Sequence, residues 1–482
     1  MKKEDLFEVL EDIDSNSVKK ARDYKGRKKS IWVKWVAVAA CAAIIVGAIW
    51  GVPAIRNGSQ SGSNVNYPSG VMTVMAAYPE PVAQTLSAQK FMESDEHWNW
   101  WNSYRELISE TEGLQSGMDG YNIALMAQLL TSDNENTVCS PLNTYIAFAM
   151  LAEVSDGNTR QQILDMLGVT DIEMLRANVS ALWESNYVDT PVLKSLLANS
   201  IWLNNSVKYN DDTLNRLAEE YYASTFSGTP GSEEMDEALR TWTDDNTGGL
   251  LTEYTKDMSI DPDTVLEILS TIYFKAMWNE EFREKNTMQE IFHGTSGDTT
   301  VDMMHRTDML GVYRTDNFTF LGLRLYDSGS MYFLLPNEGV DVNVLASDPN
   351  IIRATRYDGA DENWSFPEVH LSVPKFKVSS KTDLLEIVRA LGMTDALNPA
   401  LTDFTPLTTE RGNLYLSKAE HAAMIEIDEH GVTGAAYTEL EKLTSAAPPD
   451  DEIDFMLDRP FMFIVTARDG SILFSGIVRN ID

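Results

Sequence analysis

Residues 429–459 read EHGVTGAAYTELEKLTSAAPPDDEIDFMLDR and lie between two strand-like stretches, Ala423 to Ile427 and Phe461 to Thr466. The segment begins with small, uncharged residues, and Pro448-Pro449 closes it. A loop this long between strands is uncommon unless it is functional, although a plain flexible connection also fits the composition. Small uncharged residues could enter a sheet as an added strand at little steric cost.

The chain before this loop carries helix signals. Ser140 followed by Pro141 predicts a helix start, with Ser as the N-cap and Pro at the first helical position. Asp156-Gly157 predicts the end of that helix. Thr159 and Gln162 are spaced as a capping box, which predicts the start of the next one.

Strand patterns dominate the later part of the chain. Strand-like runs occur at Ser200 to Leu203, Ile272 to Phe274, Met331 to Leu335 and Val369 to Val373. Near the C-terminus, Phe461 to Thr466 and Ile472 to Val478 flank Asp469-Gly470, a favoured two-residue hairpin turn. Helices early and strands late indicate an α+β fold rather than alternating βαβ units.

Enzyme motifs are absent from the sequence. It contains no G-x-S-x-G, no H-E-x-x-H, no P-loop and no G-x-G-x-x-G after a strand. Acid pairs such as Glu280-Glu281 and Asp450-Asp451 read as solvated faces in so acidic a chain. The six histidines are scattered, and Cys41 and Cys139 allow at most one disulfide. We therefore expect no catalytic activity, no cofactor and no metal site.

The charge of the chain limits its partners. The formal net charge of the 482 residues is −35, and 43% of them are hydrophobic, which supports a globular core. So acidic a surface repels phosphate backbones, so nucleic-acid binding is not expected.

An uninterrupted apolar stretch lies near the N-terminus. No charged residue occurs from Trp35 to Ile55, a length that matches the roughly 20 residues needed to span a bilayer. Residues 1–56 hold 11 of the 38 basic residues but only 7 of the 73 acidic ones. The positive-inside rule then predicts a cytoplasmic leader over 1–34, a transmembrane helix over 35–55 and the remainder outside the cell membrane. A cleaved signal peptide, or a lipoprotein box at Val38-Ala39-Ala40-Cys41, is the alternative.

The segment after the strand at 423–427 resembles the reactive-centre hinge of serpins. That hinge typically reads Glu-x-Gly-Thr-Glu-Ala-Ala-Ala-Ala-Thr, and Glu429 to Thr438 reads EHGVTGAAYT. Further stretches resemble serpin signatures in the family's order: Ser140-Pro141-Leu142, Ile272 to Trp278 with Phe282, Met303 to Arg306, Val373 to Phe376, Leu416 to His421, Asp458 to Phe461, and Gly476 to Val478.

The resemblance implies a serpin domain over residues 114–482. Its fold would have a large central sheet, two further sheets, a surrounding set of helices and an exposed reactive-centre loop. Residues 56–113 would then be an extracellular linker.

The resemblance also assigns residues to the opening of the central sheet. Ser140, Ser270, His421 and Trp278 match positions in its shutter and breach regions. Ser270 stands where the family usually has an Asn that bonds to the histidine, so the network there is expected to be looser or water-bridged. Trp278 and Phe282 are also expected as core packing.

The mechanism implied is release of stored strain by loop insertion. A protease attacks the loop, forms an acyl-enzyme, and is distorted when the cut loop enters the sheet as a strand. The hinge residues are Glu429, Gly431, Val432, Thr433, Gly434, Ala435, Ala436, Tyr437 and Thr438. Side chains alternate along a strand, and the register typical of serpins implies that Val432, Gly434, Ala436, Thr438 and Leu440 would point inward. Gly434 and Tyr437 depart from the usual alanines, and Tyr437 lies on the solvent side.

In inhibitory serpins the attacked residue usually lies sixteen residues after the hinge glutamate, so the resemblance implies a reactive bond at Ser445–Ala446, or one residue earlier at Thr444–Ser445. Small residues there favour elastase-like or subtilisin-like proteases. Lys442 would suit a trypsin-like pocket instead. Cleavage there shortens the insertable strand by three residues, so trypsin should cut without being trapped.

The resulting expectation is a monomeric, membrane-tethered, extracellular inhibitor of serine proteases, with cysteine proteases as further targets. Two alternatives stay open. One is a serpin-fold binding or structural module that is cleaved without trapping. The other is an envelope sensor that couples outside cleavage to residues 1–34.

Overall fold

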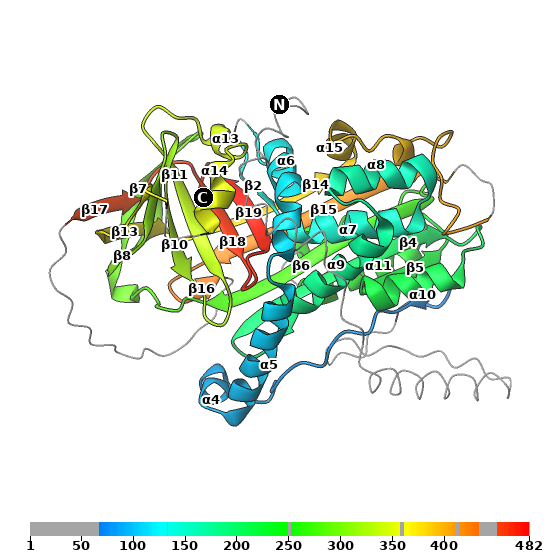
Figure 1. Ribbon diagram of the computed structural model, residues 1–482, viewed down its shortest axis with the longest axis horizontal. Coiled ribbons are helices and arrows are strands. Elements are labelled where there is room, and N and C mark those ends of the chain that lie inside the picture. The colour runs from blue at the N-terminus through cyan, green and yellow to red at the C-terminus, as the bar shows by residue number, and fades with distance from the viewer. Residues whose placement is uncertain are drawn as a thin grey trace.

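The computed structural model describes residues 67–132, 134–248, 252–356, 361–409, 414–432 and 451–481. Within these ranges the strands form three sheets, and the long strands of the largest cross the middle of the molecule (Figure 1). The expected α+β class is confirmed.

Sheet A is the largest sheet, and β3 pairs with its strand β4 outside the main path. Its order is β1 (Met72–Val74), β5 (Ala223–Gly228), β4 (Leu193–Asn204), β6 (Leu266–Met277), β16 (Gly431–Val432), β15 (Leu416–Ile427) and β14 (Phe376–Asp383), with β3 at Val188–Asp189. Sheet B runs β12 (Trp364–Ser365), β9 (Val312–Arg314), β10 (Phe318–Arg324), β11 (Ser330–Pro336), β18 (Phe461–Thr466), β19 (Ile472–Val478) and β2 (Thr137–Cys139). Sheet C runs β17 (Glu452–Met456), β13 (Glu368–Pro374), β8 (Gly297–Met309) and β7 (Thr287–Gly294).

Helices cover both faces of sheet A. The helices of the described residues are α4 (Ala88–Met92), α5 (Asp95–Thr111), η1 (Leu114–Met118), α6 (Asp119–Leu129), α7 (Pro141–Val154), α8 (Gly157–Leu167), α9 (Ile172–Asn186), α10 (Asp211–Glu220), α11 (Glu233–Asn246), α12 (Thr252–Thr255), η2 (Glu284–Asn286), α13 (Val342–Leu345), α14 (Asn350–Thr355), α15 (Leu385–Ala390) and η3 (Asp395–Leu397). In the part of the chain that is described, none of them is long and apolar enough to cross a membrane. Residues 35–55, where a spanning helix is expected, lie outside that part.

The helix α7 lies between sheets A and B. It begins as predicted, because Ser140 Oγ accepts a hydrogen bond from the Asn143 N–H (3.4 Å) and Pro141 occupies the first helical position. Every residue of α7 is buried, and it contacts both β6 and β19. Sheet A therefore packs against α7.

The capping box predicted for the next helix is wrong. Asp156, not Thr159, is the N-cap of α8. Thr159 Oγ1 instead accepts a hydrogen bond from the Asp403 N–H (2.9 Å), and Gln162 Oε1 accepts one from the Asp395 N–H (2.9 Å). The two side chains satisfy the backbone of a distant loop, which local spacing could not reveal.

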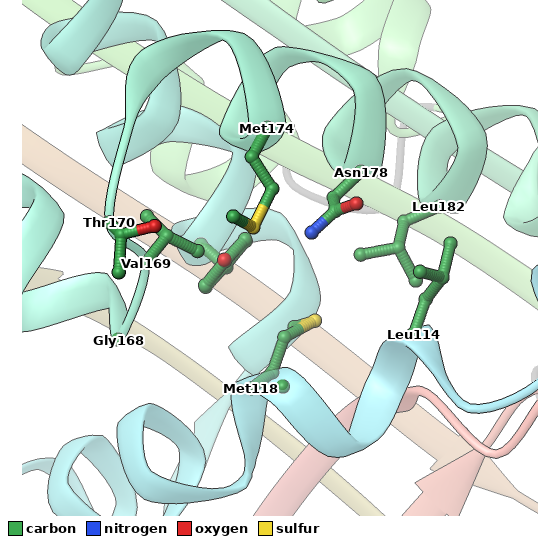
Figure 2. Close-up of a pocket in the computed structure, with 10 residues that line it drawn as sticks. Leu114, Met118, Gly168, Val169, Thr170, Met174, Asn178 and Leu182 are labelled. Atoms are coloured by element: carbon green, nitrogen blue, oxygen red, sulfur yellow. The ribbon is translucent and has the colours of Figure 1, made fainter. Parts of the chain in front are cut away.

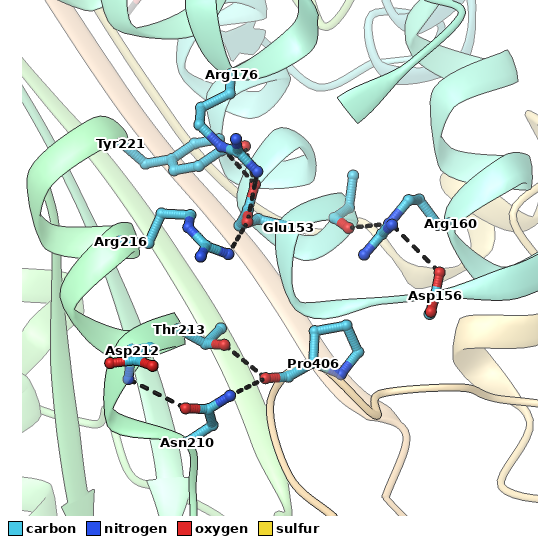
Figure 3. A network of polar contacts seen from close by, with 11 residues as sticks. Glu153, Asp156, Arg160, Arg176, Asn210, Asp212, Thr213, Arg216, Tyr221 and Pro406 are labelled. Carbon is cyan, nitrogen blue, oxygen red and sulfur yellow. Dashed lines mark hydrogen bonds and ion pairs between the residues drawn. The ribbon is translucent and has the colours of Figure 1, made fainter. Parts of the chain in front are cut away.

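A buried carboxylate joins α7 to α9 and α10 (Figure 3). Glu153 is 2% exposed and accepts hydrogen bonds from Arg176 Nη2 (2.9 Å), Arg216 Nη1 (2.9 Å) and Tyr221 OH (2.8 Å). A buried charge is tolerated only when it is paired and hydrogen-bonded in this way. The cluster therefore fixes the three helices relative to one another.

The two faces of sheet A have different neighbours, because successive side chains of a strand point to opposite faces. Ile268 and Ile272 of β6 belong to the main core, which also contains α7. Leu269 belongs to a second core with Trp202 of β4 and Trp242 of α11. The second core is thus the face that α11 covers.

The range expected as a linker, 56–113, is folded from residue 67 onward. Strand β1 extends sheet A by pairing antiparallel with β5, with Thr73 opposite Phe226. Tyr67 and Met75 pack against the core beneath α11. An edge strand of three residues carries too little periodicity to be recognised in a sequence.

The helices α4 and α5 project below the body of the molecule in Figure 1. His97 Nε2 lies 2.7 Å from Asp327 Oδ2 in the turn between β10 and β11. Trp100 stacks on Tyr104 at 5.1 Å, and Arg468 lies over the Trp101 ring at 5.3 Å. Trp100 and Trp101 are therefore packed on the domain.

Candidate functional site

The seam between β6 and β15 is the central feature of sheet A. The strands run parallel and pair directly over their N-terminal halves, from Leu266 to Ser270 and from Leu416 to His421. At their C-terminal ends the two-residue strand β16 lies between them and pairs antiparallel with both. The sheet therefore has a slot for one further strand, and the first two residues of such a strand occupy its entrance.

Gly431 and Val432 form that entrance. Val432 lies opposite Ile427 on one side and Ala276 on the other, and its side chain is fully buried. A Cβ on Gly431 would lie 2.2 Å from the Ala276 carbonyl oxygen, so only glycine fits there. The remaining hinge, Thr433 to Thr438, and the bond Ser445–Ala446 lie outside the described residues.

The turn before β16 is held by two aromatic residues. Trp278 donates from its backbone N–H to the His430 carbonyl (3.0 Å) and from its indole Nε1–H to the Asp428 carbonyl (2.9 Å). The Phe282 N–H donates to the Glu429 carbonyl (2.9 Å). Both rings are buried, as expected of core packing, and they also position the turn.

Glu429 anchors the same turn through its side chain. Its carboxylate lies 3.0 Å from Lys375 Nζ and accepts a hydrogen bond from Thr287 Oγ1 (2.7 Å). Burial acts to raise the pKa of Glu429, but the bonds from Thr287 and Lys375 outweigh it and lower that pKa. The hinge therefore starts from a charged residue tied to sheet C and to the loop between β13 and β14.

Ser140, Ser270 and His421 lie together beneath sheet A, between the seam and α7, and we call them the shutter cluster. His421 Nε2 accepts a hydrogen bond from the Ser140 N–H (2.8 Å). Ser270 lies opposite His421 in the strand register, but its hydroxyl donates to the Asn143 carbonyl (3.2 Å). No hydrogen bond between Ser270 and His421 occurs in this part of the described chain.

The imidazole of His421 is neutral. Burial lowers the pKa of His421 to about 4, and Nε2 accepts a bond, so the ring proton resides on Nδ1. Nδ1 has no hydrogen-bond partner among the described residues, and neither has the side-chain amide of Asn199, the register neighbour of Ser270 on β4. The buried polar atoms of the shutter cluster are thus only partly hydrogen-bonded within the described residues.

A cavity of about 50 Å³ lies between η1 and α9, as Figure 2 shows. Leu114 and Met118 line it from one side, and Met174, Asn178 and Leu182 from the other. Organic ligands occupy sites of roughly 300 Å³ or more. This cavity has room for water only.

The comparison with known families decides the assignment. The family profile described as "Serpin (serine protease inhibitor)" matches residues 118–481. The chain belongs to the serpin family. Similar serpins include Serpin-ZX of Arabidopsis thaliana, 28% identical over 390 residues that cover 77% of this chain and 98% of that protein. Alpha-1-antiproteinase 2 of Equus caballus is 30% identical over 362 residues, 72% of this chain and 82% of that protein.

Solved serpin structures confirm the expected three-sheet serpin fold. The native state of the thermophilic serpin tengpin has a TM-score of 0.68 at 25% sequence identity. The match covers 76% of this chain and 93% of the tengpin chain. An Arabidopsis serpin in its native stressed conformation has a TM-score of 0.63 at 27% identity, covering 78% and 98%.

The sequence did not reveal the partners of the hinge. Lys375 belongs to a quoted serpin signature, yet nothing in that signature indicates that it pairs with Glu429. Thr287 lies at the start of β7, in a stretch without any motif. Only the folded arrangement of sheets A and C brings these side chains to the turn.

Proposed function

We propose that this serpin inhibits serine proteases as a suicide substrate. A protease would cut the chain beyond Val432, and the cut segment would enter sheet A between β6 and β15. The observation that carries the proposal is the position of β16, already paired with both strands at the entrance of the slot. Insertion would continue this pairing and add hydrogen bonds that the uncut chain lacks.

The register of β16 predicts where each further residue would lie. If the pairing continued from Val432, Ala436 would lie between Ala423 and Ile272, which are both buried. Thr438 would then lie between His421 and Ser270, where its hydroxyl could accept a hydrogen bond from the Nδ1–H of the imidazole. These small residues suit the inner face of the sheet, which supports inhibition rather than cleavage without trapping.

The proposed reactive bond is Ser445–Ala446. Its small flanking residues favour elastase-like or subtilisin-like serine proteases, and a cysteine protease with a similar pocket would also be a target. Cleavage at Lys442 would shorten the inserted strand by three residues, about 10 Å at ~3.3 Å per residue. A trypsin-like protease would then be distorted less and would be released.

The experiment is to incubate the full-length chain with an elastase-like enzyme, a subtilisin-like enzyme and trypsin. We expect SDS-stable adducts with the first two, and mass spectrometry should find a C-terminal fragment that begins at Ala446. Trypsin should release a fragment that begins at Leu443 without forming an adduct. Lys442→Ala is the matched control, because it should abolish the tryptic cut and keep the elastase adduct. A stable adduct with a fragment beginning at Leu443 would overturn the bond assignment.

We further propose that the inhibitor is tethered to the cell membrane and faces outward. The apolar stretch 35–55 and the basic residues before it support this location. The target would then be a protease outside the cell.

A further inference from the structure

Four charged side chains form a chain of ion pairs across sheet A. Glu267 Oε1 lies 3.2 Å from Lys418 Nζ, Lys418 Nζ lies 3.2 Å from Glu420 Oε2, and Glu420 Oε1 lies 3.1 Å from Lys381 Nζ. Glu267 is on β6, Lys418 and Glu420 are on β15, and Lys381 is on β14. The four residues, which we call the ion chain, thus link three neighbouring strands.

One of these pairs crosses the seam. Glu267 and Lys418 are direct partners in the register of β6 and β15, in the half where the two strands still touch. Glu267 shares the face of Leu269, two residues away, which packs beneath α11. The other pairs, Lys418–Glu420 and Glu420–Lys381, lie within β15 or between β15 and β14. They are not separated when the seam opens.

Glu267 depends on this single cross-seam contact. Its side chain is 0% exposed, and among the described residues Lys418 is the cation that lies within ion-pair distance of its carboxylate. Lys418 is 26% exposed and also lies 3.5 Å from the Ser259 carbonyl oxygen. Loss of the cation that pairs with a buried carboxylate is strongly destabilising. Separation of the pair therefore has a cost that falls mainly on Glu267.

Strand insertion would separate the pair. Neighbouring strands lie about 4.8 Å apart, so a strand between β6 and β15 would move their backbones to about 9.6 Å. If the pairing of Val432 continued along the inserted strand, Glu441 would lie between Glu267 and Lys418. The incoming strand would therefore bring a further carboxylate beside Glu267 instead of a replacement cation.

We propose that the ion chain is a clasp on the seam, in which the Glu267–Lys418 pair resists strand insertion at neutral pH and yields in mild acid. The inference rests on the insertion mechanism proposed above and names residues that set its rate. Glu267 and Lys418 would act as positioning residues that hold the seam closed, so that insertion follows cleavage and does not precede it.

The charges around Glu267 explain the response to acid. Burial raises the pKa of Glu267 to about 7, and Glu420 adds to this rise, while Lys418 and Lys381 oppose it. Protonation removes the charge that holds Lys418 across the seam. It also removes the buried anion that opening would leave unpaired, so opening is coupled to proton uptake.

Among the described residues of β4 and α11, the groups named next do not compete with Lys418 for Glu267. On β4 the register neighbour is Trp202, which does not titrate. On α11, Asp236 accepts a hydrogen bond from the Ile260 N–H, and Arg240 pairs with Glu233. The acid response of the clasp is therefore assigned to Glu267.

The clasp is tested without any protease. A fluorescent peptide with the sequence of residues 431–444 is added to the uncut full-length chain, and its annealing rate is followed by anisotropy at about pH 5.5 and about pH 8. We expect annealing to be about tenfold faster at the lower pH, the effect of a difference of one pKa unit between the closed and open seam. The peptide should anneal rapidly to the Glu267→Gln variant at both pH values. Lys418→Gln, which breaks the pair from the other side, should give the same result.

Glu426→Gln is the matched control. Glu426 pairs with Lys377 at 3.9 Å between β15 and β14, so its pair does not cross the seam, and this variant should keep the wild-type pH response. Wild-type annealing that is equal at both pH values, or a Glu267→Gln chain that keeps the pH response, would overturn the clasp. Failure of the proposed function would look different: annealing would keep its pH response while no protease formed an SDS-stable adduct.

Discussion

Ser270 lies opposite His421 in the register of the seam, yet its hydroxyl reaches the Asn143 carbonyl and leaves Nδ1–H of the imidazole without an acceptor. A longer side chain with an amide oxygen could supply that acceptor. We predict that Ser270→Asn raises the free energy of unfolding by about 1 kcal/mol, the usual net worth of a buried hydrogen bond. Chemical denaturation near neutral pH measures this change. Ser270→Ala is the control and should not stabilise the chain, and a stability of Ser270→Asn at or below wild type would contradict the prediction.

Two buried groups titrate with opposite effects on stability. Burial lowers the pKa of His421 to about 4 from 6.5, so the native state resists its protonation and loses stability as the pH falls through that window. Burial raises the pKa of Glu267 to about 7 from 4.5, so the native state gains stability as the pH falls through its window. The two effects oppose each other between about pH 6.5 and pH 4.5.

Removal of one titrating group should therefore reveal the effect of the other on the pH dependence of stability. We predict that Glu267→Gln makes the free energy of unfolding fall by up to about 3 kcal/mol more than in wild type as the pH drops from about 6.5 to about 4.5. Urea unfolding at a series of pH values measures the slope, and His421→Gln should change it in the opposite direction. Parallel curves for wild type and Glu267→Gln would show that the carboxylate does not titrate in this range.

The proposed mechanism requires the hinge to become a strand of sheet A. If the pairing of Val432 continued along the inserted strand, Ala436 would lie between Ala423 and Ile272, which are both buried. We predict that Ala436→Glu slows insertion, because an unpaired carboxylate there costs several kcal/mol. The variant should be cleaved by an elastase-like protease without forming an SDS-stable adduct.

The neighbouring position provides the control for this prediction. Ala435 would face the other side of the inserted strand, so Ala435→Glu should still trap protease. Gel analysis of both variants at equal protease ratios separates the two results. Trapping by Ala436→Glu at the wild-type stoichiometry would mean that this register is not used.

Elements with strong local signals could be predicted from the sequence. The C-terminal strands were expected at Phe461 to Thr466 and Ile472 to Val478, and β18 and β19 have those bounds. The start of α7 was also predicted, because Ser140 and Pro141 act within one turn. The helical cap at Thr159 was wrong, because its hydroxyl serves a loop about 240 residues away in the chain.

Features that depend on distant strands could not be predicted. Glu267 and Lys418 read as ordinary charged residues until β6 and β15 place them face to face. The strand β1 has three residues and gains its pairing from β5, which follows about 150 residues later. In each case tertiary packing determines the pairing partner, and the local sequence gives no signal that identifies it.

At the scale of the whole molecule, the charge asymmetry around residues 35–55 predicts an orientation. We expect residues 1–34 in the cytoplasm and the serpin domain outside. Protease added to intact cells should therefore cut within 429–459, which immunoblotting of the fragments would detect. A cytoplasmic protein is the control for cell integrity. Cleavage that appears only after lysis would reverse the orientation.

The short connection between β15 and β16 has a consequence for the order in which the chain folds. Asp428 to His430 join the two strands, so this hairpin closes locally and could lengthen within microseconds. Leu266 and Leu416, by contrast, are 150 residues apart in the chain, and such non-local pairing is slow. In a ribosome-bound chain β6 emerges about 8–30 s before β15 and can already be in place. Synthesis from the N-terminus thus favours direct pairing of β6 with β15. In a chain diluted from denaturant, this slow pairing competes with the fast lengthening of the β15–β16 hairpin. Refolding should therefore give a lower yield of active inhibitor than synthesis on the ribosome.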